Sequence, residues 1–146
     1  MKRPLILLIS LGIILGFGTA LWIYNAAAPT GASVVINGTA VRPVPVLHAE
    51  SVIQGRAVYG QFCPECHGAN SGHTWHHSDE VLLYILAHGG TVFSSSSKMP
   101  AYKQTLTEAE MAAVLDFIKS TWGRQEREYQ WWMTATRTDA GTLPLP

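Results

Sequence analysis

Two cysteines and a histidine lie close together in the middle of the chain. The segment reads Cys63-Pro64-Glu65-Cys66-His67, and the 146 residues contain no other cysteine. The spacing Cys-x-x-Cys-His is the attachment motif of a c-type haem, in which each thiol forms a thioether with a haem vinyl group. The histidine that follows supplies an axial ligand to the iron. The motif therefore predicts one covalently attached haem c on Cys63 and Cys66, with His67 on the iron.

The same cysteines admit a second interpretation, a thiol–disulfide redox pair of thioredoxin type. A pair of that type lies between a strand and a helix of a βαβ unit. Here the preceding segment has helical spacing, with Val52, Gly55, Tyr59 and Phe62 on one face. The helical spacing favours the haem.

The second axial position of the iron calls for a soft ligand, and a methionine thioether is suited to it. Among the four methionines, Met1 precedes a long apolar run, Met111 falls in a predicted helix, and Met133 lies among aromatic residues. Only Met99 lies in a loop, where the following Pro100 stiffens the backbone. We therefore expect Met99 to bind the iron opposite His67.

Four other histidines offer alternatives. A bis-histidine haem would use His73, His76, His77 or His88 in place of Met99, and His73-x-x-His76-His77 resembles part of a separate metal site. No acidic or thiol side chain nearby completes such a site. A surface position, or hydrogen bonding to the haem propionates, is the simpler interpretation.

Four helices are expected to position these residues. Helical spacing and capping signals place them at residues 49–62, at 79–88 after the cap Ser78, from the capping box at Thr107 to Gly123, and at 124–133. The second and third present apolar faces made by Val81, Leu82, Ile85 and Leu86, and by Met111, Val114, Leu115 and Ile118. Met99 lies in the loop between those two helices.

Residues 49–121 resemble a small bacterial class I cytochrome c domain. Three segments carry the resemblance: Gly55-x-x-x-Tyr59-x-x-x-Cys63 matches the first helix of that family, Val114-Leu115-Asp116-Phe117-Ile118 matches its last helix, and Met99-Pro100-Ala101-Tyr102 matches the segment that supplies the second axial ligand. The resemblance implies an all-α domain at residues 49–123 around one haem c, with Gly55 and Tyr59 meeting Phe117 where two helices cross. It also implies single-electron transfer rather than catalysis.

One departure from the family concerns the axial histidine. Many members carry a proline whose carbonyl accepts a hydrogen bond from that histidine. No proline occurs between Gly68 and Met99. The resemblance therefore does not name the hydrogen-bond partner of His67.

Residues 1–24 are predicted to form a single-pass transmembrane anchor. Lys2 and Arg3 precede an uncharged apolar run, residues 5–24, and twenty helical residues span about 30 Å, the thickness of the hydrocarbon core. A cleaved signal peptide has a shorter apolar region, of about 7–15 residues, and Pro29 would impede cleavage after the preceding alanines. The positive-inside rule places the N-terminus in the cytoplasm and the haem domain on the periplasmic side of the inner membrane.

Two further segments flank the predicted haem domain. Residues 25–48 are expected to be a linker, in which Asn37-Gly38 between β-formers predicts a small hairpin. Residues 124–146 are expected to be a partly helical, partner-contacting extension. Its region is rich in side chains that are enriched at interfaces, namely Trp122, Tyr129, Trp131, Trp132 and Met133. The alternatives for these side chains are packing back on the haem domain and a belt near the membrane headgroups.

Together these features predict a fixed subunit of a larger respiratory or photosynthetic membrane complex, of quinol oxidoreductase type, such as alternative complex III. Its expected partners are other subunits, membrane lipid, and a redox protein that docks near Lys98 and Lys103. Gly12, Gly16 and Ala20 form a small-xxx-small stripe on which another transmembrane helix can pack. The alternatives are a free membrane-tethered shuttle, or a haem sensor or enzyme with a displaceable Met99.

The zero net charge and the lack of a basic stripe argue against nucleic-acid binding.

Overall fold

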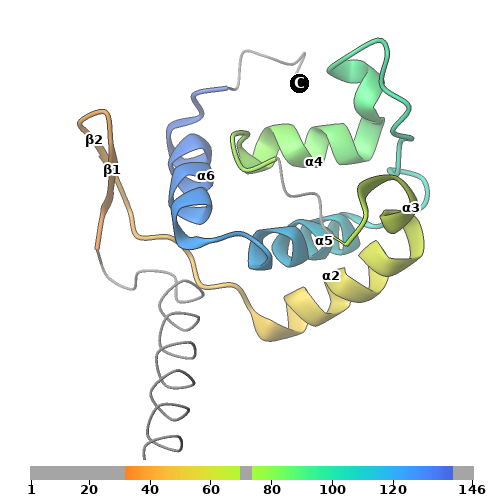
Figure 1. The fold of residues 1–146 in the computed structure, drawn as a ribbon, viewed down its shortest axis with the longest axis horizontal. Helices are drawn as coiled ribbons and strands as arrows, with labels where there is room; N and C mark the ends of the chain where they lie inside the picture. Colours follow the sequence, from red (N-terminus) through yellow and green to blue (C-terminus); the bar gives the residue numbers. More distant parts are fainter. Residues whose placement is uncertain (1–31, 70–73, 140–146) are drawn as a thin grey trace, which may run out of the picture.

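Helices make up most of residues 32–69 and 74–139, the part of the chain that the computed structural model describes (Figure 1). A two-stranded hairpin comes first, and the helices follow. The elements in chain order are β1 (Val34–Ile36), β2 (Thr39–Val41), α2 (Ala49–Phe62), α3 (Pro64–His67), α4 (Asp79–His88), the 3₁₀ turn η1 (Gly90–Val92), α5 (Glu108–Ser120) and α6 (Arg124–Thr136). The predicted all-α class therefore holds for residues 49–69 and 74–123, and the hairpin makes the described chain mostly rather than wholly helical.

The predicted anchor, residues 1–24, lies outside the described residues, as does His73. None of the helices in the described ranges has the length and apolar character that crossing a membrane requires.

Helices α2 and α5 cross in close contact and form the centre of the fold. A Cβ atom on Gly55 would lie 1.8 Å from the carbonyl oxygen of Ala113, so only glycine permits this approach. Four residues later, the rings of Tyr59 and Phe117 lie 5.1 Å apart. The expected contact of Tyr59 with Phe117 is confirmed, whereas Gly55 faces the backbone of Ala113 and Val114 instead.

The predicted buried face of α2 needs one correction. Gly55 and Tyr59 are buried, but Val58 takes the place expected for Phe62. Phe62 is 39% exposed, because it is the last residue of α2 and lies edge-on to Tyr102 rather than beneath α5.

The ends of α4 and α5 form as their sequences predict. The Ser78 hydroxyl accepts a hydrogen bond from the Val81 amide at the start of α4. At the start of α5, the Thr107 side chain accepts from the Glu110 amide, and the Glu110 carboxylate accepts from the Thr107 amide. These caps satisfy amide groups that have no partner within the helix.

A second small core joins the hairpin to α6. The strands pair antiparallel with Val34 opposite Val41, and Asn37 and Gly38 both have positive φ, as a tight two-residue turn requires. Val34 and Val44 pack against Trp132 and Met133 of α6. The aromatic side chains Trp131 and Trp132 also donate hydrogen bonds to backbone carbonyls of the hairpin region.

This packing corrects the role predicted for the aromatic residues near the C-terminus. Trp122, Trp132 and Met133 are buried, so these three side chains do not form a surface open to a partner. Trp132 and Met133 pack within the chain because the hairpin covers one face of α6 and shields it from water. Whether the C-terminal extension contacts a partner stays a prediction.

A polar cluster fixes α6 to the helices of the central domain. The Gln130 amide of α6 donates to Asp79 at 2.5 Å and to the His77 carbonyl at 3.2 Å. The Asp79 carboxylate also pairs with Lys119 of α5 at 2.7 Å. Buried polar groups are stable only when they are satisfied in this way, so the C-terminal helix has a defined position on the domain.

Candidate functional site

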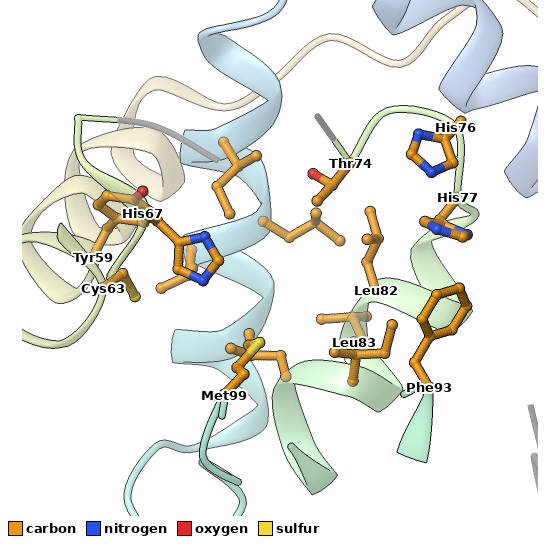
Figure 2. Close-up of a pocket in the computed structure, with 15 residues that line it drawn as sticks. Tyr59, Cys63, His67, Thr74, His76, His77, Leu82, Leu83, Phe93 and Met99 are labelled. Carbon is orange, nitrogen blue, oxygen red and sulfur yellow. The ribbon is translucent and has the colours of Figure 1, made fainter. Parts of the chain in front are cut away.

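An apolar cavity lies against the Cys-x-x-Cys-His segment and the Met99 loop (Figure 2). Its volume is about 330 Å³. Its lining comes from α2, α3, α4, α5 and the loops beside α4: Tyr59, Cys63, His67, Thr74, His76, His77, Leu82, Leu83, Ile85, Leu86, Phe93, Met99, Val114, Leu115 and Ile118. Three of the four predicted haem-site residues therefore meet at one cavity, and Cys66 is not among its lining residues.

The cysteine motif is held in a short helical turn that follows α2 directly. The His67 amide donates to the Cys63 carbonyl at 3.0 Å, and Gly68 then leaves the helix with φ +67°. The Tyr59 hydroxyl donates to the Gly68 carbonyl at 3.3 Å, which ties the end of the turn to α2. The turn directs the His67 ring into the cavity beside Cys63.

The two cysteines differ in their surroundings. Cys63 is buried, Cys66 is exposed, and no disulfide joins them. Burial raises the pKa of the Cys63 thiol, so this group remains protonated in neutral solution. Two free thiols three positions apart on one turn are what the predicted pair of thioether bonds requires.

The loop that carries Met99 is fixed to the end of α4. The Gly90 amide donates to the Met99 carbonyl at 3.0 Å, and the Tyr102 amide donates to the Leu86 carbonyl at 3.0 Å. A Cβ atom on Gly89, whose φ is +85°, would lie 2.9 Å from the Met99 carbonyl oxygen. The two glycines thus let the loop lie against α4, and the Met99 sulfur extends into the same cavity as the His67 ring.

Apolar side chains of α4 and α5 form most of the cavity wall. The faces predicted for these helices supply Leu82, Ile85, Leu86, Val114, Leu115 and Ile118. Two predicted face residues, Val81 and Met111, are buried but are not among the lining residues. Sequence reasoning did not assign Phe93 to the site, and its only signal was an aromatic residue in an otherwise polar loop.

Three polar residues line the cavity on the side opposite Cys63: Thr74, His76 and His77. The rings of His76 and His77 lie 4.2 Å apart, while His88 stacks on Tyr84 away from this wall. In the described ranges, no three His, Cys, Asp or Glu side chains gather in a way that could hold a metal ion. The wall therefore differs in polarity from the rest of the cavity without resembling a metal site.

The residues present fit a haem. An imidazole and a thioether enter one cavity from separate segments, and both are established axial ligands of haem iron. The walls between them are almost entirely aliphatic or aromatic, as the apolar faces of a porphyrin require. A cysteine thiol lies at the cavity edge next to the histidine.

Comparison with known protein families agrees with this geometry. Residues 50–118 match the family model described as "Cytochrome C oxidase, cbb3-type, subunit III". No curated protein and no solved structure matches the chain. The match covers a little under half of the chain and supports a small class I cytochrome c domain, a type of domain that implies haem c and electron transfer.

Proposed function

We propose that this chain is a membrane-anchored mono-haem cytochrome c that transfers single electrons as a fixed subunit of a larger membrane complex. The observation that carries the proposal is the convergence of Cys63, His67 and Met99 on one apolar cavity within a cytochrome c domain. Cys63 and Cys66 would hold the haem through thioether bonds. His67 and Met99 would bind its iron from opposite faces.

The residues around the cavity favour electron transfer over catalysis. When bound, the haem supplies one-electron redox chemistry at its iron. With His67 and Met99 both in place, no coordination position remains for a substrate, and His/Met ligation raises the reduction potential. The leucine and valine side chains of α4 and α5 that line the cavity would exclude water from the haem.

Attachment to a complex rests on two further observations. The apolar run at residues 5–24 is long enough for a membrane anchor, with the cytochrome domain outside the cytoplasm. The matched family is described as an oxidase subunit, which agrees with a place in a membrane electron-transport assembly. The exposed Lys98 and Lys103 beside the Met99 loop would face a docking redox protein.

The test is purification from native membranes in mild detergent, followed by intact mass and by identification of co-purifying proteins. The expected mass is the full chain from Met1 plus one haem, retained after denaturation and acid–acetone extraction. Loss of the haem on extraction would refute covalent attachment. A chain beginning near Pro29 or Thr30 would refute the anchor, and a lone monomer would favour the free tethered shuttle.

A further inference from the structure

A haem is chemically asymmetric, and so is the cavity. The vinyl groups, which react with cysteines, lie on a different part of the porphyrin rim from the two negatively charged propionates. Cys63 marks the vinyl side of the cavity, and Thr74, His76 and His77 form a polar wall on the opposite side (Figure 2). We propose that His77 pairs with a haem propionate and that Asp139, in the C-terminal extension, is the positioning residue for His77. This inference rests on the proposed haem.

The His77 ring is held with one nitrogen toward Asp139. His77 Nδ1 lies 3.5 Å from Asp139 Oδ2, and the two side chains are 17% and 7% exposed. The separation is at the limit of a hydrogen bond, and Nδ1 is a buried polar atom without a hydrogen-bond partner in the described structure. The carboxylate thus faces one nitrogen of a ring that lines the cavity, and we assign Nε2, the other nitrogen, to the propionate.

The backbone at His77 is fixed from the same C-terminal segment. The Asp139 carboxylate accepts a hydrogen bond from the Ser78 amide at 2.8 Å. The Gln130 amide of α6 donates to the His77 carbonyl at 3.2 Å. Both anchoring residues lie beyond residues 50–118, the cytochrome domain match. The C-terminal extension thus completes the polar wall that the domain itself leaves unsupported.

The charges favour His77 over His76 as the propionate partner. Among the described residues, Asp139 and His76 are titratable groups in contact with the His77 ring, and the neutral ring of Phe93 lies against it at 5.2 Å. A propionate opposite Asp139 would place the His77 ring between two carboxylates, one beside each ring nitrogen. An imidazolium has a donor on each nitrogen and can serve both carboxylates at once. His76 lies T-shaped to Trp75, with 5.7 Å between the ring centroids.

The experiment uses the haem-loaded full chain and two measurements that do not depend on activity. One is the reduction potential, and the other is the propionate bending mode in the resonance Raman spectrum. We expect His77→Leu to shift the propionate mode and to lower the potential, because a positive charge near the haem favours the ferrous state. His77→Gln retains a donor without the charge, so its Raman shift is expected to be smaller than that of His77→Leu.

A second set of variants tests the positioning role of Asp139. Asp139→Asn keeps an oxygen for the Ser78 amide but removes the charge, and it is expected to shift the propionate mode in the same direction as His77→Leu. In the His77→Leu background, Asp139→Asn is expected to add no further shift. Arg137→Gln is the matched control, because it breaks the Arg137–Glu80 ion pair in the same segment and leaves His77 untouched.

Three results would overturn the inference: an unchanged propionate mode in both His77 variants, the full shift from His76→Leu instead, or equal shifts from Arg137→Gln and Asp139→Asn. Each of these results is measured only on variant protein that retains covalent haem and a low-spin spectrum. Absence of covalent haem from the unmutated protein would instead refute the proposed function, so the two failures are distinguishable.

Discussion

At the scale of single residues, the position of Met99 depends on backbone contacts rather than on its own side chain. Gly89 and Gly90 let the loop lie against the end of α4, and the Gly90 amide fixes the Met99 carbonyl. The loop is tied down again at Tyr102, whose hydroxyl donates to the Phe62 carbonyl at 3.1 Å. A thioether held this firmly at the cavity is well suited to remain on the iron in both oxidation states.

We predict that Met99→Ala abolishes the near-infrared sulfur-to-iron absorption band of the oxidised protein and lowers its reduction potential. The reason is that the thioether stabilises ferrous iron and alanine cannot replace it. Met111→Leu is the matched control, since it changes a buried methionine at nearly constant volume. An unchanged spectrum in Met99→Ala would place the ligand elsewhere, with His73, His76, His77 and His88 as the candidates.

At the scale of elements, the crossing of α2 and α5 determines whether the haem cavity has its shape. We predict that Gly55→Ala lowers the thermal midpoint, with an overpacking cost of about 1–3 kcal/mol or more, because its Cβ would meet the Ala113 carbonyl. Gly60→Ala lies on the same helix with nothing within 4 Å of the added Cβ. That control is expected to stabilise by about 0.5–1 kcal/mol. Equal effects on thermal unfolding would contradict the tight crossing.

The capping box of α5 gives a prediction that depends on pH. The Thr107 amide and hydroxyl both donate to the Glu110 carboxylate at 2.8 Å, and these bonds lower the pKa of Glu110. A lowered pKa means that the stabilisation is present above the ordinary pKa of a glutamate and is lost as the pH falls through the folded-state value. Thr107→Ala is expected to cost about 1 kcal/mol at neutral pH.

Chemical denaturation at several pH values checks this prediction. The difference in unfolding free energy between the unmutated protein and Glu110→Gln is expected to shrink in acid, where both side chains are neutral. A difference that stays constant across the titration would show that the carboxylate charge has no part in the cap.

Elements and site residues were predictable to the extent that their causes are local. The bounds of α2 follow from helical spacing, and the start of α4 follows from the Ser78 cap. The residues of the Cys-x-x-Cys-His turn are identified by the motif itself. The place of Phe93 in the cavity wall and the hydrogen bond between Asp139 and Ser78 each bring together segments that are distant in the sequence. No local sequence pattern predicts contacts of this kind. The burial of Trp132 and Met133 likewise depends on a hairpin nearly a hundred residues earlier, and composition alone indicated an exposed interface.

At the scale of the whole molecule, the described chain contains two packed cores. One surrounds the cavity through Val58, Tyr59, Leu86 and Val114, and the other joins the hairpin to Trp132 and Met133. In Figure 1 the hairpin lies beside α6, away from α3 and the cysteine motif. The segment that follows the predicted anchor is thus attached to the C-terminal helix, away from the cysteine motif.

The packing of the hairpin on α6 changes which parts of the chain can be expected to attach it to a membrane complex. Trp132 and Met133 of α6 are buried and offer no contact surface, so attachment to a complex would rest on the predicted anchor and on side chains that reach the surface. The large exposed apolar side chains of the described residues are Val35, Val46, Ile53, Phe62 and Phe93. Two weak contacts linked by one chain give strong overall attachment, because the second forms at high effective concentration. Weakening the anchor contact is therefore expected to loosen the whole subunit.

We predict that replacing Gly12 and Gly16 together by isoleucine reduces co-purification with the complex while leaving the haem spectrum intact. Small residues spaced by four let transmembrane helices approach closely, and branched side chains would hold them apart. Gly18→Ile is the control, because position 18 lies on nearly the opposite side of a helix from position 16. Quantitative mass spectrometry after mild-detergent purification measures the retained partners. Equal retention in the double variant and the control would show that this stripe does not attach the chain, and the free tethered shuttle would then be the better description.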